Sequence, residues 1–460
     1  MKKEIPVVQG NVYEIEIHSL GSSGEGVGRC KDFTVFVPGA LPGEKCAALI
    51  VEVKKSYARG RIKELLRKSK DRVEPVCDVY PSCGGCQLQH LAYMAQLRAK
   101  RQQVVDAVTR IGKRPDLFVE PVIGAASPWN YRNKMQFPVG KKKNEILIGC
   151  FAQGSHEIIN TTDCHIQKTG NNDVIRAVRG ILEKLNIPVY HEDRHSGVVR
   201  HVVGRVGKGG ELMVVLVTAT ERLPREKEFV RLLRERLPRA VSIHQNVQTY
   251  RNNVILGRDT KLLWGRPTIL DRLGRLEFHI SPRSFFQVNT DQAEILYGKA
   301  LEYAGLSGDE IVVDAYCGTG TITLFLARKA RKVYGIEIVK PAILDARKNA
   351  RENNVRNAEF LVGDATQVMP MLCRQGIRAD VVVADPPRAG CAPEVLRTFA
   401  DMAPRRIVYV SCNPASLARD IAILDELGYR ATKIQPVDMF PQTASVESVA
   451  LLERKQGTVQ

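Results

Sequence analysis

The stretch Ile311-Val-Val-Asp314-Ala-Tyr-Cys-Gly318-Thr-Gly320-Thr321 sets the architecture of the C-terminal part of the chain. A short apolar run ends in an acid and a glycine-rich turn, and a helical pattern follows. Strand, glycine turn and helix open the nucleotide-binding half of a doubly wound sheet, whose ligands bind at the carboxyl ends of the strands. Glycines in the turn let the backbone approach a ligand closely. The stretch therefore predicts an α/β domain with a nucleotide-like ligand.

Apolar runs of strand length recur downstream of this stretch and alternate with helical patterns. They occupy residues 333–336, 359–361, 381–384 and 407–410. Short apolar strands separated by helices are typical of a parallel, doubly wound sheet. We therefore predict a Rossmann-like α/β fold for residues 277–460.

An acid follows each of the first four predicted strands, and the last three are Glu337, Asp364 and Asp385. Glu337 lies about 20 residues after the glycine turn, where an acid can accept hydrogen bonds from ribose hydroxyls. Thr323 stands where a dinucleotide-binding protein has its third glycine, so the pattern favours S-adenosylmethionine instead. The alternative for each acid is a helix N-cap.

Cys412 closes the fifth predicted strand, in Ser411-Cys-Asn-Pro414. A helix is expected to begin at Pro414, because proline suits the first helical position. A helix N-terminus favours the thiolate over the free thiol, whose pKa is about 8.5. An isolated cysteine usually only packs, but the strand-end position and the nearby Asp385-Pro-Pro-Arg388 favour a nucleophile.

Glu447 lies in a predicted late strand, Ser445-Val-Glu-Ser-Val-Ala-Leu-Leu452. Alternation places it on one face with Val449 and Leu451. A carboxylate on an apolar face is costly unless it is paired or functional. The alternative is an edge strand with Glu447 in water.

The 460 residues suggest about three domains. Residues 1–66 are predicted to form a small OB-like β-barrel, because residues 12–19 and 45–53 alternate between apolar and polar side chains. Residues 67–276 are predicted to form a central α+β domain with a hairpin at 199–218 and a helix at about 91–111. That helix could also pack on the C-terminal domain.

The net charge of +18 favours a phosphate-bearing partner. Arg132 and Lys134 beside Tyr131 are candidate RNA contacts, because a stacking ring and two cations coincide. The chain has neither the apolar run of about 18 residues that spans a membrane nor a signal peptide. We therefore expect a cytoplasmic protein with no membrane partner, and no obligate protein partner is inferred.

Four of the eleven cysteines form a candidate metal site. The spacing is Cys77-x5-Cys83-x2-Cys86, with Cys164 farther along the chain. Four thiolates suit either zinc or an iron–sulfur cluster, and the spacing does not choose between them. The other cysteines outside the Cys412 motif are predicted to pack in cores: Cys30, Cys46, Cys150, Cys317, Cys373 and Cys391.

Four motifs give the chain a family resemblance: Ser284-Phe-Phe-Gln-Val-Asn289, Asp314-Ala-Tyr-Cys-Gly-Thr-Gly320, Asp385-Pro-Pro-Arg-Ala-Gly390 and Ser411-Cys-Asn-Pro414. Over essentially its whole length the chain resembles the RNA uracil-C5 methyltransferases, and its barrel resembles their TRAM domain. The resemblance implies methylation of a uridine at C5, with Cys412 as covalent nucleophile and Glu447 as base. It departs from the family pattern at Ser445, where relatives often have His, and at Thr321, where they often have Asn.

The resemblance also implies ligands and a substrate. The expected S-adenosylmethionine contacts are Gln287, Tyr316, Thr321, Glu337, Asp364 and Asp385. A [4Fe-4S] cluster is implied at Cys77, Cys83, Cys86 and Cys164. The implied substrate is 23S ribosomal RNA, with transfer RNA the weaker alternative.

Three other functions fit the sequence less well. A radical S-adenosylmethionine methylthiotransferase needs Cys-x3-Cys-x2-Cys, which the chain lacks. An amino-group methyltransferase carries Asp-Pro-Pro-Tyr, but Arg388 stands in place of the tyrosine. A non-catalytic ribosome-assembly factor has no need of Cys412 and Glu447.

Overall fold

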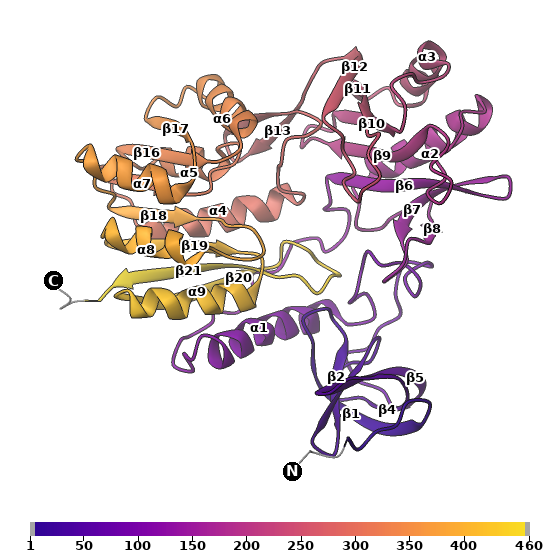
Figure 1. Cartoon of the computed structure of the whole chain (residues 1–460), viewed down its shortest axis with the longest axis horizontal. Helices are drawn as coiled ribbons and strands as arrows, with labels where there is room; N and C mark the ends of the chain where they lie inside the picture. Colours follow the sequence, from indigo (N-terminus) through magenta and orange to yellow (C-terminus); the bar gives the residue numbers. More distant parts are fainter. Residues whose placement is uncertain (1–4, 456–460) are drawn as a thin grey trace.

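Residues 5–455 are described by the structure, a computed structural model. They form a closed N-terminal barrel, a central sheet and a C-terminal sheet, in chain order. In Figure 1 the barrel lies below the C-terminal sheet, and the central sheet lies beside that sheet at the upper right.

The predicted N-terminal barrel is confirmed. Its strands are β1 (Val12–Leu20), β2 (Gly26–Cys30), β3 (Phe33–Val37), β4 (Lys45–Val53) and β5 (Tyr57–Arg67), closed in the order β1-β2-β3-β5-β4. Alternate residues such as Ile15 and Ile17 are buried in its core. Closure leaves the barrel no free sheet edge.

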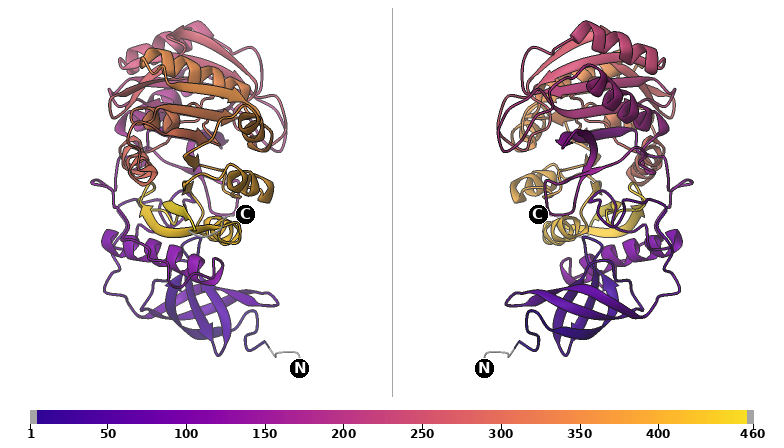
Figure 2. Two further views of the ribbon diagram at one scale, coloured as in Figure 1. Left: turned by 90° about the vertical axis from the view of Figure 1, so that its left-hand side faces the viewer. Right: turned by 90° about the vertical axis from the view of Figure 1, so that its right-hand side faces the viewer.

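Helix α1 (Tyr93–Arg110) lies between the barrel and the C-terminal sheet in the views of Figure 2. Its Val104 and Val108 are buried in the same core cluster as Leu417 of α9 (Pro414–Glu426). The helix thus joins the C-terminal core, although its sequence lies far from that domain.

The central sheet has the strand order β12-β11-β10-β9-β6-β7-β8. Its strands are β6 (Lys134–Lys142), β7 (Glu145–Phe151), β8 (Ile158–Asn160), β9 (Val199–Val206), β10 (Leu212–Thr218), β11 (Ala240–Val247) and β12 (Asp259–Gly265). The predicted hairpin is confirmed as β9 and β10, which pair antiparallel. Helices α2 (Thr169–Lys184) and α3 (Glu226–Arg236) share a core with one face, whereas the other face packs toward the C-terminal domain.

The C-terminal sheet confirms the predicted doubly wound fold. Its order is β17-β16-β15-β18-β19-β21-β20. The parallel strands are β15 (Ile311–Asp314), β16 (Lys332–Glu337), β17 (Ala358–Val362), β18 (Val381–Ala384) and β19 (Arg406–Ser411). Strand β21 (Glu447–Arg454) runs antiparallel between β19 and β20 (Tyr429–Val437). The order reverses between β15 and β18, so a ligand crevice is expected at their carboxyl ends.

Helices cover both faces of this sheet. The core on one face includes α4 (Thr290–Ala304), α5 (Thr321–Ala327) and α6 (Lys340–Glu352). The core on the other includes α1, α7 (Ala365–Arg374), α8 (Pro393–Asp401) and α9. A hairpin of β13 (Ile269–Leu273) and β14 (Leu276–Ile280) packs in the first of these cores. The hairpin spans the predicted boundary between the central and C-terminal domains at residue 276. That domain boundary therefore stays a prediction.

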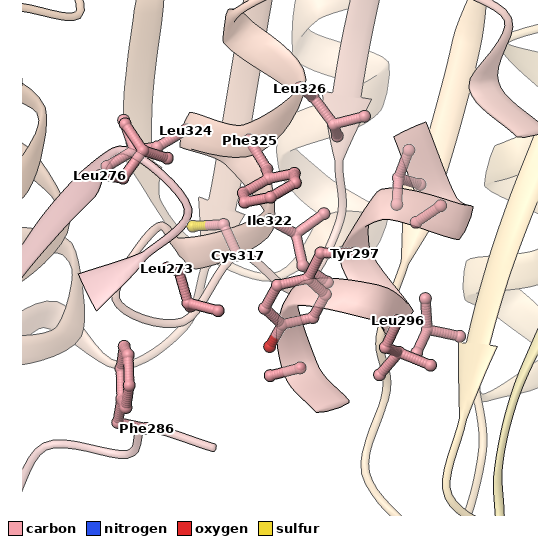
Figure 3. Packing of buried hydrophobic residues seen from close by; sticks show 14 of the residues in the cluster. Leu273, Leu276, Phe286, Leu296, Tyr297, Cys317, Ile322, Leu324, Phe325 and Leu326 are labelled. Carbon is pink, nitrogen blue, oxygen red and sulfur yellow. The ribbon is translucent and has the colours of Figure 1, made fainter. Parts of the chain in front are cut away.

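Apolar packing fixes the start of α5, as Figure 3 shows. Tyr297 of α4 lies against Phe325 of α5, with ring centroids 6.2 Å apart at 62°. Ile322 is buried in the same cluster. This packing holds the turn before α5 at the carboxyl edge of the sheet.

Within residues 5–455, no helix is both long and apolar enough to span a membrane.

Candidate active site

The glycine turn after β15 is built as the sequence predicts. Gly318 and Gly320 have φ of 53° and 85°, in the left-handed region that favours glycine. A Cβ on Gly318 would meet nothing within 4 Å, so the turn faces open space. Its amide donates a hydrogen bond to Glu337 Oε2 at 3.2 Å. An adenosine-bearing ligand could approach the backbone here.

Three of the four strand-end acids have partners in the protein. Asp314 is buried and accepts a hydrogen bond from Thr323 Oγ1 at 2.6 Å. Glu337 also accepts from the Val339 amide. Asp364 caps α7 by accepting from the Thr366 amide at 2.8 Å. For Asp364 the N-cap alternative therefore describes the structure, although a capping carboxylate can keep a second oxygen for a ligand.

Asp385 differs from these acids. Its carboxylate makes no hydrogen bond or ion pair with any residue in the described range 5–455. Burial, and secondarily the nearby Asp314 carboxylate, raise its pKa to about 7. An unpaired acid at the strand-order reversal is a site where a ligand's donor or positive charge would replace the missing partner.

The other predicted cofactor residues lie around the same edge. Tyr316 follows β15, and Thr321 is the first residue of α5. Gln287 is buried before α4, and its carbonyl accepts from Asn133 Nδ2 at 2.9 Å. The Tyr297 side chain lies close to the side chains of both Thr321 and Gln287. Sequence reasoning missed Tyr297, because its spacing in α4 marks it only as a core residue.

Strand pairing brings Cys412 and Glu447 together. In the antiparallel pair β19 and β21, Ser411 lies opposite Ser448. Continuing that register by one position sets Cys412 opposite Glu447, a separation of roughly 5 Å between Cα atoms. Glu447 is 5% exposed on an inner strand, so the alternative of a solvated edge strand is wrong. As predicted, Val449 and Leu451 belong to one core cluster.

The Glu447 carboxylate has no hydrogen bond or ion pair within the described part of the chain. Burial and then Asp385 raise its pKa to about 8, while Arg388 acts in the opposite direction. A buried, unpaired carboxylate is costly to folding, which favours a chemical role over a structural one.

The prediction that the surroundings of Cys412 lower its pKa and favour the thiolate is wrong. Helix α9 does begin at Pro414 as predicted, with Asn413 as its cap. Burial nevertheless raises the pKa of Cys412, and Glu447 and Asp385 add to this, whereas Arg388 lowers it. Burial is the largest cause, and Glu447 on β21 and Asp385 just after β18 act in the same direction.

The predicted cysteines share one cavity. Cys77, Cys83, Cys86 and Cys164 line a space of about 260 Å³ together with Cys150. Cys150, on β7, lies beside Cys83. It also packs against the central core, as predicted, but its place in the cavity was missed because only the β7 fold-back brings it there.

The donor set suits some metals better than others. Among residues 5–455, no group of three or more His, Cys, Asp or Glu side chains is close enough to hold a metal ion. Zinc needs its thiolates about 2.3 Å from one centre. A cubane cluster binds each cysteine through a different iron and spreads the sulfurs around a larger body. The four thiols line one cavity without converging on one point, so a cluster would suit them better than a single ion.

Of the candidate RNA contacts, Lys134 begins β6 of the central sheet and Arg132 lies just before it, whereas the predicted stacking ring of Tyr131 is buried. Lys134 makes no ion pair or hydrogen bond through its ammonium within the described residues. Burial, Arg205 and Arg132 lower its pKa to about 7. Arg132 donates to the Lys134 carbonyl at 3.2 Å. A phosphate would neutralise this cationic group. Three further lysines, Lys141, Lys142 and Lys143, lie exposed at the β6–β7 turn, which is typical of a solvated loop.

The chain is similar in sequence to RNA methyltransferases. Residues 269–455 match the model of the tRNA (uracil-5-)-methyltransferase family, and residues 6–63 match the TRAM domain. An RNA methyltransferase of Clostridium tetani is 50% identical over 453 residues, 98% of each chain. One of Halalkalibacterium halodurans is 50% identical over 455 residues, 99% of each chain.

A solved structure also covers nearly the whole chain. The Pyrococcus abyssi tRNA (uracil-54, C5)-methyltransferase in complex with S-adenosyl-L-homocysteine has a TM-score of 0.77 and 31% identity. The match covers 95% of this chain and 99% of that one. The similarity therefore extends through the barrel, the central sheet and the C-terminal sheet together.

Proposed function

Because this chain belongs to the RNA (uracil-5-)-methyltransferase family and is an S-adenosylmethionine-dependent enzyme of that class, we propose that it methylates C5 of uridine through a covalent adduct between Cys412 and C6. The observation that carries this mechanism is the buried, unpaired Glu447 carboxylate opposite Cys412 across β19 and β21. A nucleophile and a base are thereby held at one sheet edge.

The proposed chemistry starts with the weakness of uracil C5 as a nucleophile. The Cys412 thiolate adds to C6, and the resulting enolate raises electron density at C5. C5 takes the methyl group of S-adenosylmethionine, and S-adenosylhomocysteine is the leaving group. Glu447 then accepts the C5 proton, and the electron pair of that C–H bond re-forms the C5–C6 double bond as the C6–S bond breaks. Cys412 leaves as thiolate and is ready for another turnover.

The raised pKa of Glu447 suits this role, since a stronger base takes a carbon-bound proton more readily. The proposed contacts of the methyl donor are the side chains at the carboxyl edge of the sheet. They are Gln287, Tyr316, Thr321, Glu337, Asp364 and Asp385. Asp385 is the strongest candidate, because its carboxylate is the one without a protein partner among the strand-end acids.

The fate of the C5 hydrogen tests the reaction. With RNA tritiated at C5 of uridine, one tritium should be released for each methyl group incorporated, whereas methylation of nitrogen or oxygen releases none. We propose 23S ribosomal RNA as the substrate, with the target base flipped or in a loop. Running the assay with 23S and transfer RNA transcripts separates the two substrates, and methylation without tritium release would contradict C5 as the site.

Activity should rise with pH. Glu447 must be ionised to act as base, and its pKa of about 8 exceeds the usual value, so protonation removes activity as the pH falls below about 8. The raised pKa of Cys412 acts in the same direction. A kcat profile between about pH 6 and pH 9 should increase across this range. A flat profile would show that neither group limits turnover.

We propose that Cys77, Cys83, Cys86 and Cys164 hold a [4Fe-4S] cluster, which would tie their segments together without serving methyl transfer. Protein purified without oxygen should contain about four iron and about four sulfide per chain. Cys86→Ser should lose most of the iron, whereas Cys373→Ser, on α7 outside the cavity, should keep it. Zinc in place of iron would overturn the assignment.

A further inference from the structure

The segment 438–444 lies between β20 and β21 and leads toward Glu447. Side chains of α1 bind Asp438, the first residue of this segment. Asp438 is fully buried and accepts from Lys100 Nζ at 2.6 Å and from the Tyr93 hydroxyl at 2.9 Å. Lys100 is also fully buried and donates to the Phe440 carbonyl at 3.0 Å. Either charge alone would be costly in this interior, so the pair forms only when α1 lies on the segment.

A second contact with α1 fixes the middle of the segment. Gln442 is buried with φ of 69°, a left-handed conformation that a non-glycine residue keeps only when its surroundings enforce it. Its amide donates to Gln96 Oε1 at 3.1 Å, and Gln96 Nε2 donates to Gln442 Oε1 at 2.9 Å. The reciprocal pair holds both backbone and side chain of Gln442.

The carbonyls of the segment are bound by other parts of the molecule. The donors are Gln292 to Asp438, Asn289 to Met439, Tyr131 to Pro441, and the amides of Gln87 and Leu88 to Gln442, at 2.9–3.1 Å. They come from α4, from the start of the central sheet and from the residues just after Cys86. In Figure 1 the segment lies at the end of β21 opposite its arrowhead, beside α1.

We propose that residues 438–444 form a brace that positions Glu447, and that Lys100 and Gln96 are positioning residues for removal of the C5 proton. This inference rests on the proposed function. Glu447 has no side-chain partner in the described chain, so its carboxylate is located by the backbone that begins at the brace. Cys412 directly follows β19, a strand that is not continuous with the brace. Loosening the brace should therefore slow proton removal more than adduct formation.

The double variant Lys100→Met/Asp438→Asn tests the brace without leaving a lone buried charge. With ordinary uridine RNA, the fraction of enzyme held as covalent adduct at steady state should rise about tenfold. The kcat should fall by a similar factor, because a small displacement of a catalytic base lowers the rate by at least this much. The rate of adduct formation with 5-fluorouridine RNA should stay unchanged. A variant that is merely less folded lowers both signals together.

The matched control is Arg405→Met/Glu310→Gln, which removes another pair with a buried carboxylate. Glu310 is 4% exposed and lies before β15, at the sheet edge away from the brace. This control should leave the adduct fraction unchanged. If the double variant does not fold, Gln96→Met removes the hydrogen bonds to Gln442 with little change in volume and should give the same accumulation.

Two failures can be distinguished. If the wild-type enzyme forms no adduct with 5-fluorouridine RNA, the proposed function fails. The brace alone is overturned by a different result. In that case the wild-type enzyme forms the adduct, but both brace variants show the same adduct fraction as the control. Their kcat is then reduced only in proportion to the fraction of the protein that is folded.

Discussion

Cys412→Ala is expected to abolish methyl transfer and the covalent bond to RNA together. Without sulfur addition at C6, C5 of uracil has too little electron density to attack a methyl group. Loss of a covalent nucleophile typically costs several orders of magnitude, and we expect kcat to fall by more than about 10⁴-fold. Binding of the RNA itself should change little, because the thiol is one small group in an extended interface.

Trapping on 5-fluorouridine RNA measures this directly. Fluorine at C5 replaces the proton that Glu447 would remove, so the reaction stops at the adduct, which survives a denaturing gel. Wild-type enzyme with S-adenosylmethionine should give the shifted band, and so should the control Cys373→Ser. An adduct that persists in Cys412→Ala, or none in the wild type, would refute Cys412 as the nucleophile.

Glu447→Gln should give the opposite result, an adduct that accumulates on ordinary RNA. Addition of sulfur and arrival of the methyl group do not need the base, but release of the C5 proton does. Turnover should fall by about 10³-fold, within the range for loss of a general base. The covalent complex should contain one methyl group per RNA bound, which a labelled methyl donor measures.

The control for this variant lies on the same strand. Glu453→Gln removes a carboxylate at the far end of β21, which pairs with Arg406 at 3.5 Å. Its kcat and adduct level should match the wild type. Wild-type turnover in Glu447→Gln, or lost activity without a methylated adduct, would contradict the assignment of Glu447 as base.

The fold of the C-terminal domain follows from local patterns. Apolar runs of strand length, a glycine turn and intervening helices predict a parallel sheet, and a parallel sheet brings its strand ends to one edge. This is why the sequence predicts that Glu337, Asp364 and Asp385 lie at one edge of the sheet. Alternation likewise put Glu447 on the buried face with Val449, and β21 confirms it.

The electrostatics of the site depended on contacts between distant segments. The sequence around Cys412 predicts a thiolate from its helix N-terminus and its place at the strand end, but burial raises its pKa, and Glu447 and Asp385 from other segments add to this. The sequence motifs also do not determine which strand-end carboxylate keeps no protein partner. Asp364 accepts a hydrogen bond as the cap of α7, whereas Asp385 has none.

The sequence alone thus determined the strand and helix order, the glycine turn and the residues at the strand ends, because side-chain periodicity and turn chemistry act over a few residues. Tertiary structure alone determined the cavity place of Cys150, the Lys100–Asp438 pair and the Gln96–Gln442 pair. The last two join residues 338 and 346 positions apart. Burial makes such contacts strong, but their partners are set by how the sheets and α1 pack.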